Sequence, residues 1–214
     1  MAESIIAVIG ARGGTGRPVV GALRKNGARV RAISRNVDVA GGFPVDVEIC
    51  PAGLKDSQSL IAAFRGVTSI HYIPPSFDPG ELEFARNIIM AAECAGVSRI
   101  VYHSVLHPGT PEMPHHLRKS HVEHQLRHSE LVWTIMQPAM YAQTVLAFLD
   151  ASAGELIPAF DPAKPFTPVH EGDLAEAAAI IHSSDSHAYA TYELAGSEVM
   201  TFITMSEKLG QVLG

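Results

Sequence analysis

The chain has 214 residues, of which 47% are hydrophobic and 18% are charged, and its formal net charge is -6. This composition is typical of a packed globular domain and excludes a disordered chain. The acidic balance argues against nucleic acid as a partner, and no apolar run reaches the roughly 18 residues of a membrane-spanning helix. With only Cys50 and Cys94 and an N-terminus that leads directly into an apolar run, we expect free thiols in a cytoplasmic protein.

The first predicted element is a buried strand over Ile5–Ile9, followed by a helix that begins near Arg17. Between them, Gly10, Gly13 and Gly16 recur at every third position. A glycine turn that joins a strand to a helix aims backbone N–H groups and the positive end of the helix dipole at one point. Without side chains, a pyrophosphate can approach this backbone. The pattern predicts a dinucleotide-binding loop, and the alternative is a tight turn with incidental glycines.

The rest of the chain alternates between predicted strands and helices. Further strands are expected over residues 29–34, 45–50, 67–73, 99–104, 131–136 and 190–194, and further helices over residues 57–64, 81–95, 115–128, 141–150, 173–182 and 201–213. Asp56 and Asp173 are the expected N-caps of two of these helices. This alternation predicts right-handed βαβ units and a doubly wound parallel sheet, the Rossmann-type α/β fold. We expect one domain over residues 1–214, in which residues 138–214 form a smaller substrate-side region.

The end of the second predicted strand decides the cofactor. An acidic residue there would bind the ribose 2′-hydroxyl of NAD, but the chain has Ser34, Arg35 and Asn36, with no acid before Asp38. An arginine attracts the 2′-phosphate of NADP, and Arg12 in the glycine loop adds a second positive charge. The sequence therefore predicts NADP(H), and the alternative for Arg35 is a solvated surface residue.

The predicted cofactor contacts lie at the carboxyl ends of the strands, where ligands bind in open α/β sheets. They are Gly10, Arg12, Gly13, Gly14, Thr15, Gly16, Ser34, Arg35, Ile73, Pro74, Lys119 and Pro138.

Histidines are numerous, with 11 in the chain, and several cluster in the segment over residues 103–128. No His-Glu-x-x-His pattern and no acidic ligand at metal-site spacing accompanies them. We therefore predict no metal site. We interpret the His, Glu and Arg side chains of the helix over residues 115–128 as a solvent-exposed face.

The ordered set of motifs resembles the NmrA-like family, atypical short-chain dehydrogenase/reductases. The resemblance rests on residues 10–16, 34–36, 54–60, 119–123, 133–138 and 169–173. It implies an NADP-preferring Rossmann domain. Members of this family include reductases of quinones, dyes and phenylpropanoid-type compounds, and also cofactor-binding redox sensors with little turnover. The chain departs from the family pattern at Ala52-Gly53 and Gln137-Pro138, and it ends at Gly214, before elements that usually help to build the substrate pocket.

The predicted catalytic residues are Lys119, His115 and Ser104. The Tyr-x-x-x-Lys pair of short-chain reductases is absent from the chain. His115 and Lys119 share one helix face at i, i+4. We expect His115 to act as a general acid or relay, and Lys119 to hold the nicotinamide ribose and lower the pKa of a neighbour. The family resemblance also implies that a lysine at this place contributes to catalysis or cofactor binding. Ser104, at a strand end, would hydrogen-bond a substrate oxygen. The alternative for His115 and Lys119 is a solvated helix face.

Three functions follow from these features. The first is an NADPH-dependent reductase of a small carbonyl, quinone or enone compound. The second is a non-catalytic NADP(H)-binding sensor that regulates a partner, and the third is a non-redox isomerase or cyclase on the same fold. The apolar stripe of the helix over Glu81–Ala95 fits a homodimer interface as well as the face of the sheet.

Overall fold

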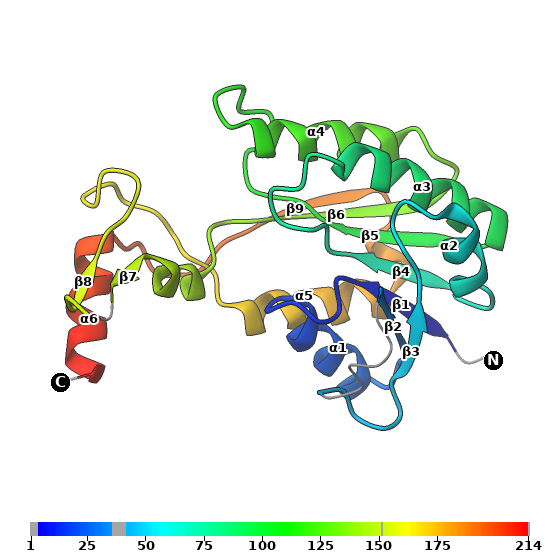
Figure 1. Ribbon diagram of the computed structural model, residues 1–214, viewed down its shortest axis with the longest axis horizontal. Coiled ribbons are helices and arrows are strands. Elements are labelled where there is room, and N and C mark those ends of the chain that lie inside the picture. Colours follow the sequence, from blue (N-terminus) through cyan, green and yellow to red (C-terminus); the bar gives the residue numbers. More distant parts are fainter. Residues whose placement is uncertain (1–3, 36–41, 151, 214) are drawn as a thin grey trace.

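A parallel sheet flanked by helices on both faces forms the body of the protein (Figure 1). The computed structural model describes residues 4–35, 42–150 and 152–213, so Asn36, Asp38 and Gly214 lie outside the described residues. The seven strands of the described sheet have the order β3-β2-β1-β4-β5-β6-β9. Every neighbouring pair in it is parallel, which confirms the predicted doubly wound α/β fold.

The elements follow the predicted alternation along the chain. The strands of the sheet are β1 (Ile5–Ile9), β2 (Arg29–Ser34), β3 (Glu48–Pro51), β4 (Ser69–Tyr72), β5 (Arg99–His103), β6 (Val132–Pro138) and β9 (Ala190–Leu194). The helices are α1 (Gly16–Lys25), α2 (Ser57–Ala63), α3 (Glu81–Ala95), α4 (Pro114–Arg127), α5 (Glu171–Ser183) and α6 (Phe202–Leu213). Two 3₁₀ segments, η1 (Ala142–Phe148) and η2 (Asp185–His187), and the hairpin β7 (Leu149–Asp150) and β8 (Glu155–Leu156) complete the described chain.

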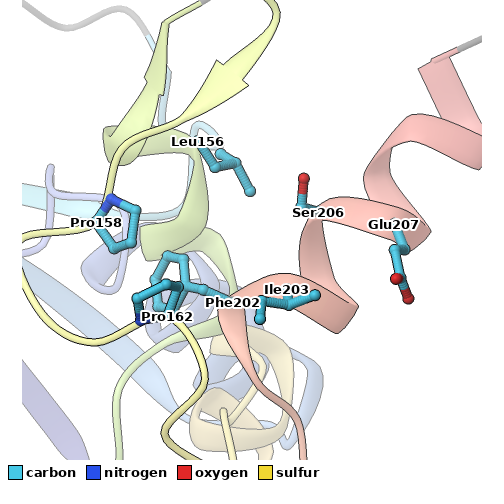
Figure 2. A pocket seen from close by; sticks show the side chains of 7 residues that line it. All are labelled: Leu156, Pro158, Pro162, Phe202, Ile203, Ser206 and Glu207. Carbon is cyan, nitrogen blue, oxygen red and sulfur yellow. The ribbon is translucent and has the colours of Figure 1, made fainter.

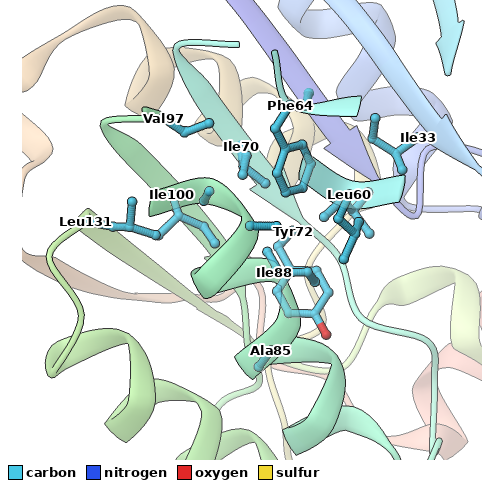
Figure 3. Close-up of a cluster of buried hydrophobic side chains, with 14 of the residues drawn as sticks. Ile33, Leu60, Phe64, Ile70, Tyr72, Ala85, Ile88, Val97, Ile100 and Leu131 are labelled. Atoms are coloured by element: carbon cyan, nitrogen blue, oxygen red, sulfur yellow. The ribbon is translucent and has the colours of Figure 1, made fainter. Parts of the chain in front are cut away.

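The core has two layers, one on each face of the sheet. Figure 3 shows the layer under α2 and α3, where Phe64, Tyr72 and Ile88 are fully buried with Leu60 and Ile100. The opposite layer, under α1 and α5, is made of smaller residues from β1, β2 and the two helices. Because both faces are covered, the strands need apolar residues on both sides, and this explains the continuous apolar run of β1.

The apolar face of α3 packs on the sheet and against α2 and α4 within this chain. Of its larger apolar side chains, Met90 is the exposed one. The face that fitted a dimer interface in the sequence is therefore covered internally, and a homodimer stays an untested prediction.

Several predicted boundaries are corrected by the structure. The third strand begins at Glu48 instead of residue 45, because Val45 lies in an exposed turn and pairing with β2 starts at Glu48. The fourth and fifth strands end at Tyr72 and His103, one residue before their predicted ends. The segment over residues 141–150 forms the 3₁₀ segment η1 and strand β7 instead of one α-helix.

Of the two predicted N-caps, Asp56 is confirmed and Asp173 is wrong. The carboxylate of Asp56 accepts hydrogen bonds from the backbone N–H groups of Gln58 and Ser59, as an N-cap does. The N-cap of α5 is His170, whose Nδ1 accepts from Gly172 N at 3.0 Å. Asp173 lies instead within the first turn of α5, where its charge is favourable to the helix dipole.

The C-terminal region extends beyond the sheet, at the left of Figure 1, with β7, β8 and α6 gathered together. Val145, Phe202 and Met205 form its small core. An open cavity of about 250 Å³ lies in this region. Figure 2 shows the side chains that line it, Leu156, Pro158, Pro162, Phe202, Ile203, Ser206 and Glu207. Its lining residues do not include any part of the glycine loop, so it is separate from the predicted dinucleotide site.

Candidate active site

The strand order reverses between β1 and β4. From β1 the chain continues outward on one side to β2 and β3, and β4 then lies on the other side of β1. A crevice forms at such a switch point, beyond the carboxyl ends of the strands. The glycine loop between β1 and α1 lies there.

Two of the loop glycines are required by close backbone contacts. Gly10 has a φ of +81°, and a Cβ on it would lie 2.6 Å from the carbonyl oxygen of Ile73. A Cβ on Gly16 would overlap the carbonyl oxygen of Gly10. The loop is thus a tight turn that presses against the end of β4, and its bare backbone faces the crevice.

A cavity of about 760 Å³ occupies this crevice. Ten of the twelve predicted cofactor residues line it, namely Gly10, Arg12, Gly13, Gly14, Thr15, Gly16, Ser34, Arg35, Ile73 and Pro74. Lys119 and Pro138 are not among its lining residues. The volume lies within the usual range for small-molecule and cofactor sites.

Three cationic side chains are among the residues that line the cavity. Arg12, Arg35 and Lys55 all line it. The Nε of Arg12 donates to the Oγ of Ser34 at 2.9 Å, which ties the glycine loop to the end of β2. The donor set therefore fits a dinucleotide whose ribose carries a phosphate. Sequence reasoning missed Lys55, although it stands in the family-like segment before Asp56.

Ala52 and Gly53, where the chain departs from the family pattern, also line the cavity. They follow β3 at the edge where an adenine ring would lie. The cavity wall is therefore present there, but it lacks the aspartate of the Gly-Asp pair that the family resemblance leads one to expect.

Lys119 lies in a buried ion pair instead of on a solvated helix face. Its Nζ is 2.8 Å from Oε1 of Glu81, which also accepts from the hydroxyl of Tyr102 at 2.8 Å. Glu81 is 1% exposed. Burial lowers the pKa of the Lys119 amine while the Glu81 carboxylate opposes this shift. Burial, then the charge of Glu81, raises the pKa of Tyr102 well above its ordinary value.

Ser104 is also buried, and its hydroxyl is engaged. Its Oγ donates to Oε1 of Glu123 at 2.5 Å, and Gln137 Nε2 donates to the same oxygen at 2.8 Å. Arg127 pairs with the other oxygen of Glu123 at 3.1 Å. The predicted contact of Ser104 with a substrate oxygen therefore requires its bond to Glu123 to break, and it stays a prediction.

His115 is the second residue of α4, one helical turn before Lys119. Its ring packs against Phe77, with ring centroids 4.8 Å apart, and against His116. Burial, followed by the neighbouring charge of His116, lowers the pKa of His115. The ring is not part of the cavity lining, and its predicted role as a general acid stays untested.

Sequence reasoning missed the pair formed by His103 and Tyr141. The Nε2 of His103, at the end of β5, lies 2.7 Å from the hydroxyl oxygen of Tyr141. The same hydroxyl interacts with the side chain of Thr15 in the glycine loop, and burial raises the pKa of Tyr141 to about 12. The signal available in the sequence was the place of both residues near the carboxyl ends of strands, His103 as the last residue of β5 and Tyr141 three residues after β6.

Within the described part of the chain, no group of three or more His, Cys, Asp or Glu residues is arranged to hold a metal ion. No described helix is both long and apolar enough to cross a membrane.

The NmrA-like family model matches residues 2–207. The protein belongs to this family. The chain is 31% identical over 217 residues to quinone oxidoreductase 2 of Escherichia coli, covering 98% of this chain and 75% of that protein.

Solved structures agree with this assignment. The NADPH complex of an NADPH-dependent quinone oxidoreductase from Escherichia coli superposes with a TM-score of 0.86 at 29% identity, over 96% of this chain and 75% of that one. The NADP(H) complex of triphenylmethane reductase from Citrobacter sp. gives a TM-score of 0.85 at 26% identity, over 97% and 75% of the two chains. The family and the Rossmann-type fold expected from the sequence are confirmed, and the comparisons agree with the predicted oxidoreductase class and NADP(H) cofactor.

Proposed function

We propose that this member of the NmrA-like family is an NADPH-dependent reductase of a small quinone, carbonyl or enone compound. The observation that carries the proposal is the cavity at the switch point, which is lined by a bare glycine backbone and by three cationic side chains. The relatives that reduce quinones and triphenylmethane dyes support a conjugated, electron-accepting substrate.

Bound NADPH would supply the hydride, and the residues of this chain would bind and orient it. The glycine loop fits the pyrophosphate, because N–H groups at a helix N-terminus favour anions. Arg35, Arg12 and Lys55 fit the 2′-phosphate. Within this proposal Lys119 holds the nicotinamide ribose while Glu81 fixes its ammonium group, and His115 is the proton donor predicted from the sequence.

Titration with NADPH and NADH by calorimetry tests the cofactor site. We expect Arg35→Glu to weaken NADPH binding about tenfold or more, because it replaces an attraction to the 2′-phosphate with a repulsion. NADH binding should change little. Arg86→Glu on the exposed face of α3 makes the same change of charge away from the cavity and is the control. Equal affinity of the Arg35 variant and the wild type for NADPH would contradict the proposed phosphate site.

Oxidation of NADPH in the presence of 1,4-naphthoquinone then tests turnover. NADPH binding without oxidation by any quinone, enone or carbonyl compound would favour the sensor function. Conversion of a substrate without consumption of NADPH would favour an isomerase or cyclase.

A further inference from the structure

Three histidines form a row that begins at the sheet interior and ends at a partly exposed helix residue. His71 on β4 and His103 on β5 are 0% and 2% exposed, whereas His182 on α5 is partly exposed. The Nε2 of His182 lies 3.2 Å from Nδ1 of His71. The rings of His71 and His103 meet edge to face, with centroids 5.9 Å apart.

The two ends of the row have different surroundings. At the partly exposed end, Nδ1 of His182 lies 3.0 Å from Oγ of Ser69. At the inner end, Nε2 of His103 lies 2.7 Å from the hydroxyl oxygen of Tyr141, which interacts with Thr15. Since Thr15 lines the dinucleotide cavity, the row joins a partly exposed helix residue to the candidate active site.

Two nitrogens in the middle of the row are buried without a hydrogen-bond partner among the described residues. They are Nε2 of His71 and Nδ1 of His103, and they belong to neighbouring rings. A buried polar atom without a partner costs free energy, so such a pair calls for an explanation. A short reorientation of either ring that brings one nitrogen toward the other would complete a continuous chain.

The ring nitrogens admit two consistent proton arrangements. Burial lowers the pKa of all three histidines, to about 3 for His71, so each ring is neutral with one donor and one acceptor nitrogen. In the first arrangement, Tyr141 donates to Nε2 of His103, and each following N–H points toward His182. In the second arrangement every donor is reversed and points toward Tyr141. Conversion of the second into the first moves one proton equivalent inward, from His182 to Tyr141.

We infer that Tyr141 donates the proton of the reaction and that His103, His71 and His182 form the relay that returns a proton to it. This inference rests on the proposed reductase function. The hydride that bound NADPH would supply leaves an oxygen anion on the reduced quinone, and this anion takes the Tyr141 proton. The O–H bond of Tyr141 breaks and a new O–H bond forms on the product. His103 then donates from Nε2 to the tyrosinate and takes a proton at Nδ1 from Nε2 of His71. His71 takes one at Nδ1 from Nε2 of His182. Nδ1 of His182 takes one proton from water through the hydroxyl of Ser69.

Tyr141 is better placed for this role than His115. Neither side chain is among the lining residues of the cavity, but the hydroxyl of Tyr141 interacts with Thr15, which is. The ring of His115 instead packs between Phe77 and His116. Tyr141 also has a buried proton source behind it in His103. A covered active site needs such an internal source, because bound cofactor and substrate exclude bulk water.

The test compares His71→Phe with His121→Phe, a substitution at an exposed position of α4. His71 is far enough along the row that its loss leaves Tyr141 and its bond to His103 in place.

We expect His71→Phe to bind NADPH as the wild type does and to lower kcat for 1,4-naphthoquinone about tenfold or more, since proton transfer contributes on this scale. The solvent deuterium isotope effect on kcat should increase, and added imidazole should restore part of the rate. His182→Asn, at the partly exposed end, is the second variant should His71→Phe fail to fold.

Each outcome is informative. A wild type that binds NADPH but reduces no quinone refutes the proposed function and leaves the relay without a reaction. A wild type that turns over, together with a His71 variant of unchanged kcat and isotope effect, refutes the relay alone. Loss of kcat in His115→Phe but not in Tyr141→Phe would return the proton-donor role to His115.

Discussion

Acid should destabilise the folded protein well above the pH at which carboxylates titrate, because His71 is buried as a neutral ring. Its pKa falls from an ordinary 6.5 to about 3 through burial. A histidine with a lowered pKa stabilises the fold above its unfolded pKa, and this stability is lost as the pH falls toward the folded pKa. Between about pH 7.5 and 5.5, His71 alone should reduce the free energy of unfolding by about 1.4 kcal/mol. Burial also lowers the pKa of His103 and His182, so both add to this loss.

Urea unfolding followed by circular dichroism, in the absence of NADPH, measures this change at each pH. The window stays above the range in which carboxyl groups take up most of their protons. His121→Gln, at an exposed position of α4, should leave the difference between the two pH values unchanged. A wild type whose free energy of unfolding changes by less than about 0.5 kcal/mol across the window would mean that His71 is charged or solvated in the native state, and the reasoning would be wrong.

Other substitutions test the loop, the buried ion pair and a helix cap. Gly16→Ala should abolish NADPH binding in calorimetry because its Cβ overlaps the Gly10 carbonyl, whereas Gly21→Ala has open space on α1 and should bind normally. Glu81→Gln should lower the free energy of urea unfolding by about 3 kcal/mol, because it leaves the Lys119 charge buried without its partner. Glu83→Gln, at an exposed position of the same helix, should change it by less than about 0.5 kcal/mol. Asp56→Ala should cost about 1 kcal/mol in the same assay, since it removes the N-cap of α2.

The sequence by itself determined the elements of the sheet and the cofactor edge. Apolar runs bounded by glycine marked β1, β2 and α3 at their observed limits, because strand and helix periods are local properties of the chain. The glycine spacing and Arg35 placed the dinucleotide cavity, because a strand–glycine turn–helix unit builds its binding loop from consecutive residues. Pairing partners are not local, so the sequence pattern places the start of β3 at residue 45, whereas its register with β2 starts the strand at Glu48.

Only the tertiary structure decided what surrounds the polar side chains away from that loop. Lys119 has a helical neighbour in His115, but its charge partner is Glu81 on another helix, 38 residues away in the chain. The row of His71, His103 and His182 joins two strands and a helix whose sequence positions share no motif. Such contacts arise where the sheet and α5 bring distant segments together, and burial at these points then changes the pKa of each group. Local pattern carries no information on that environment, which is why the buried ion pair and the histidine row appeared only in the folded chain.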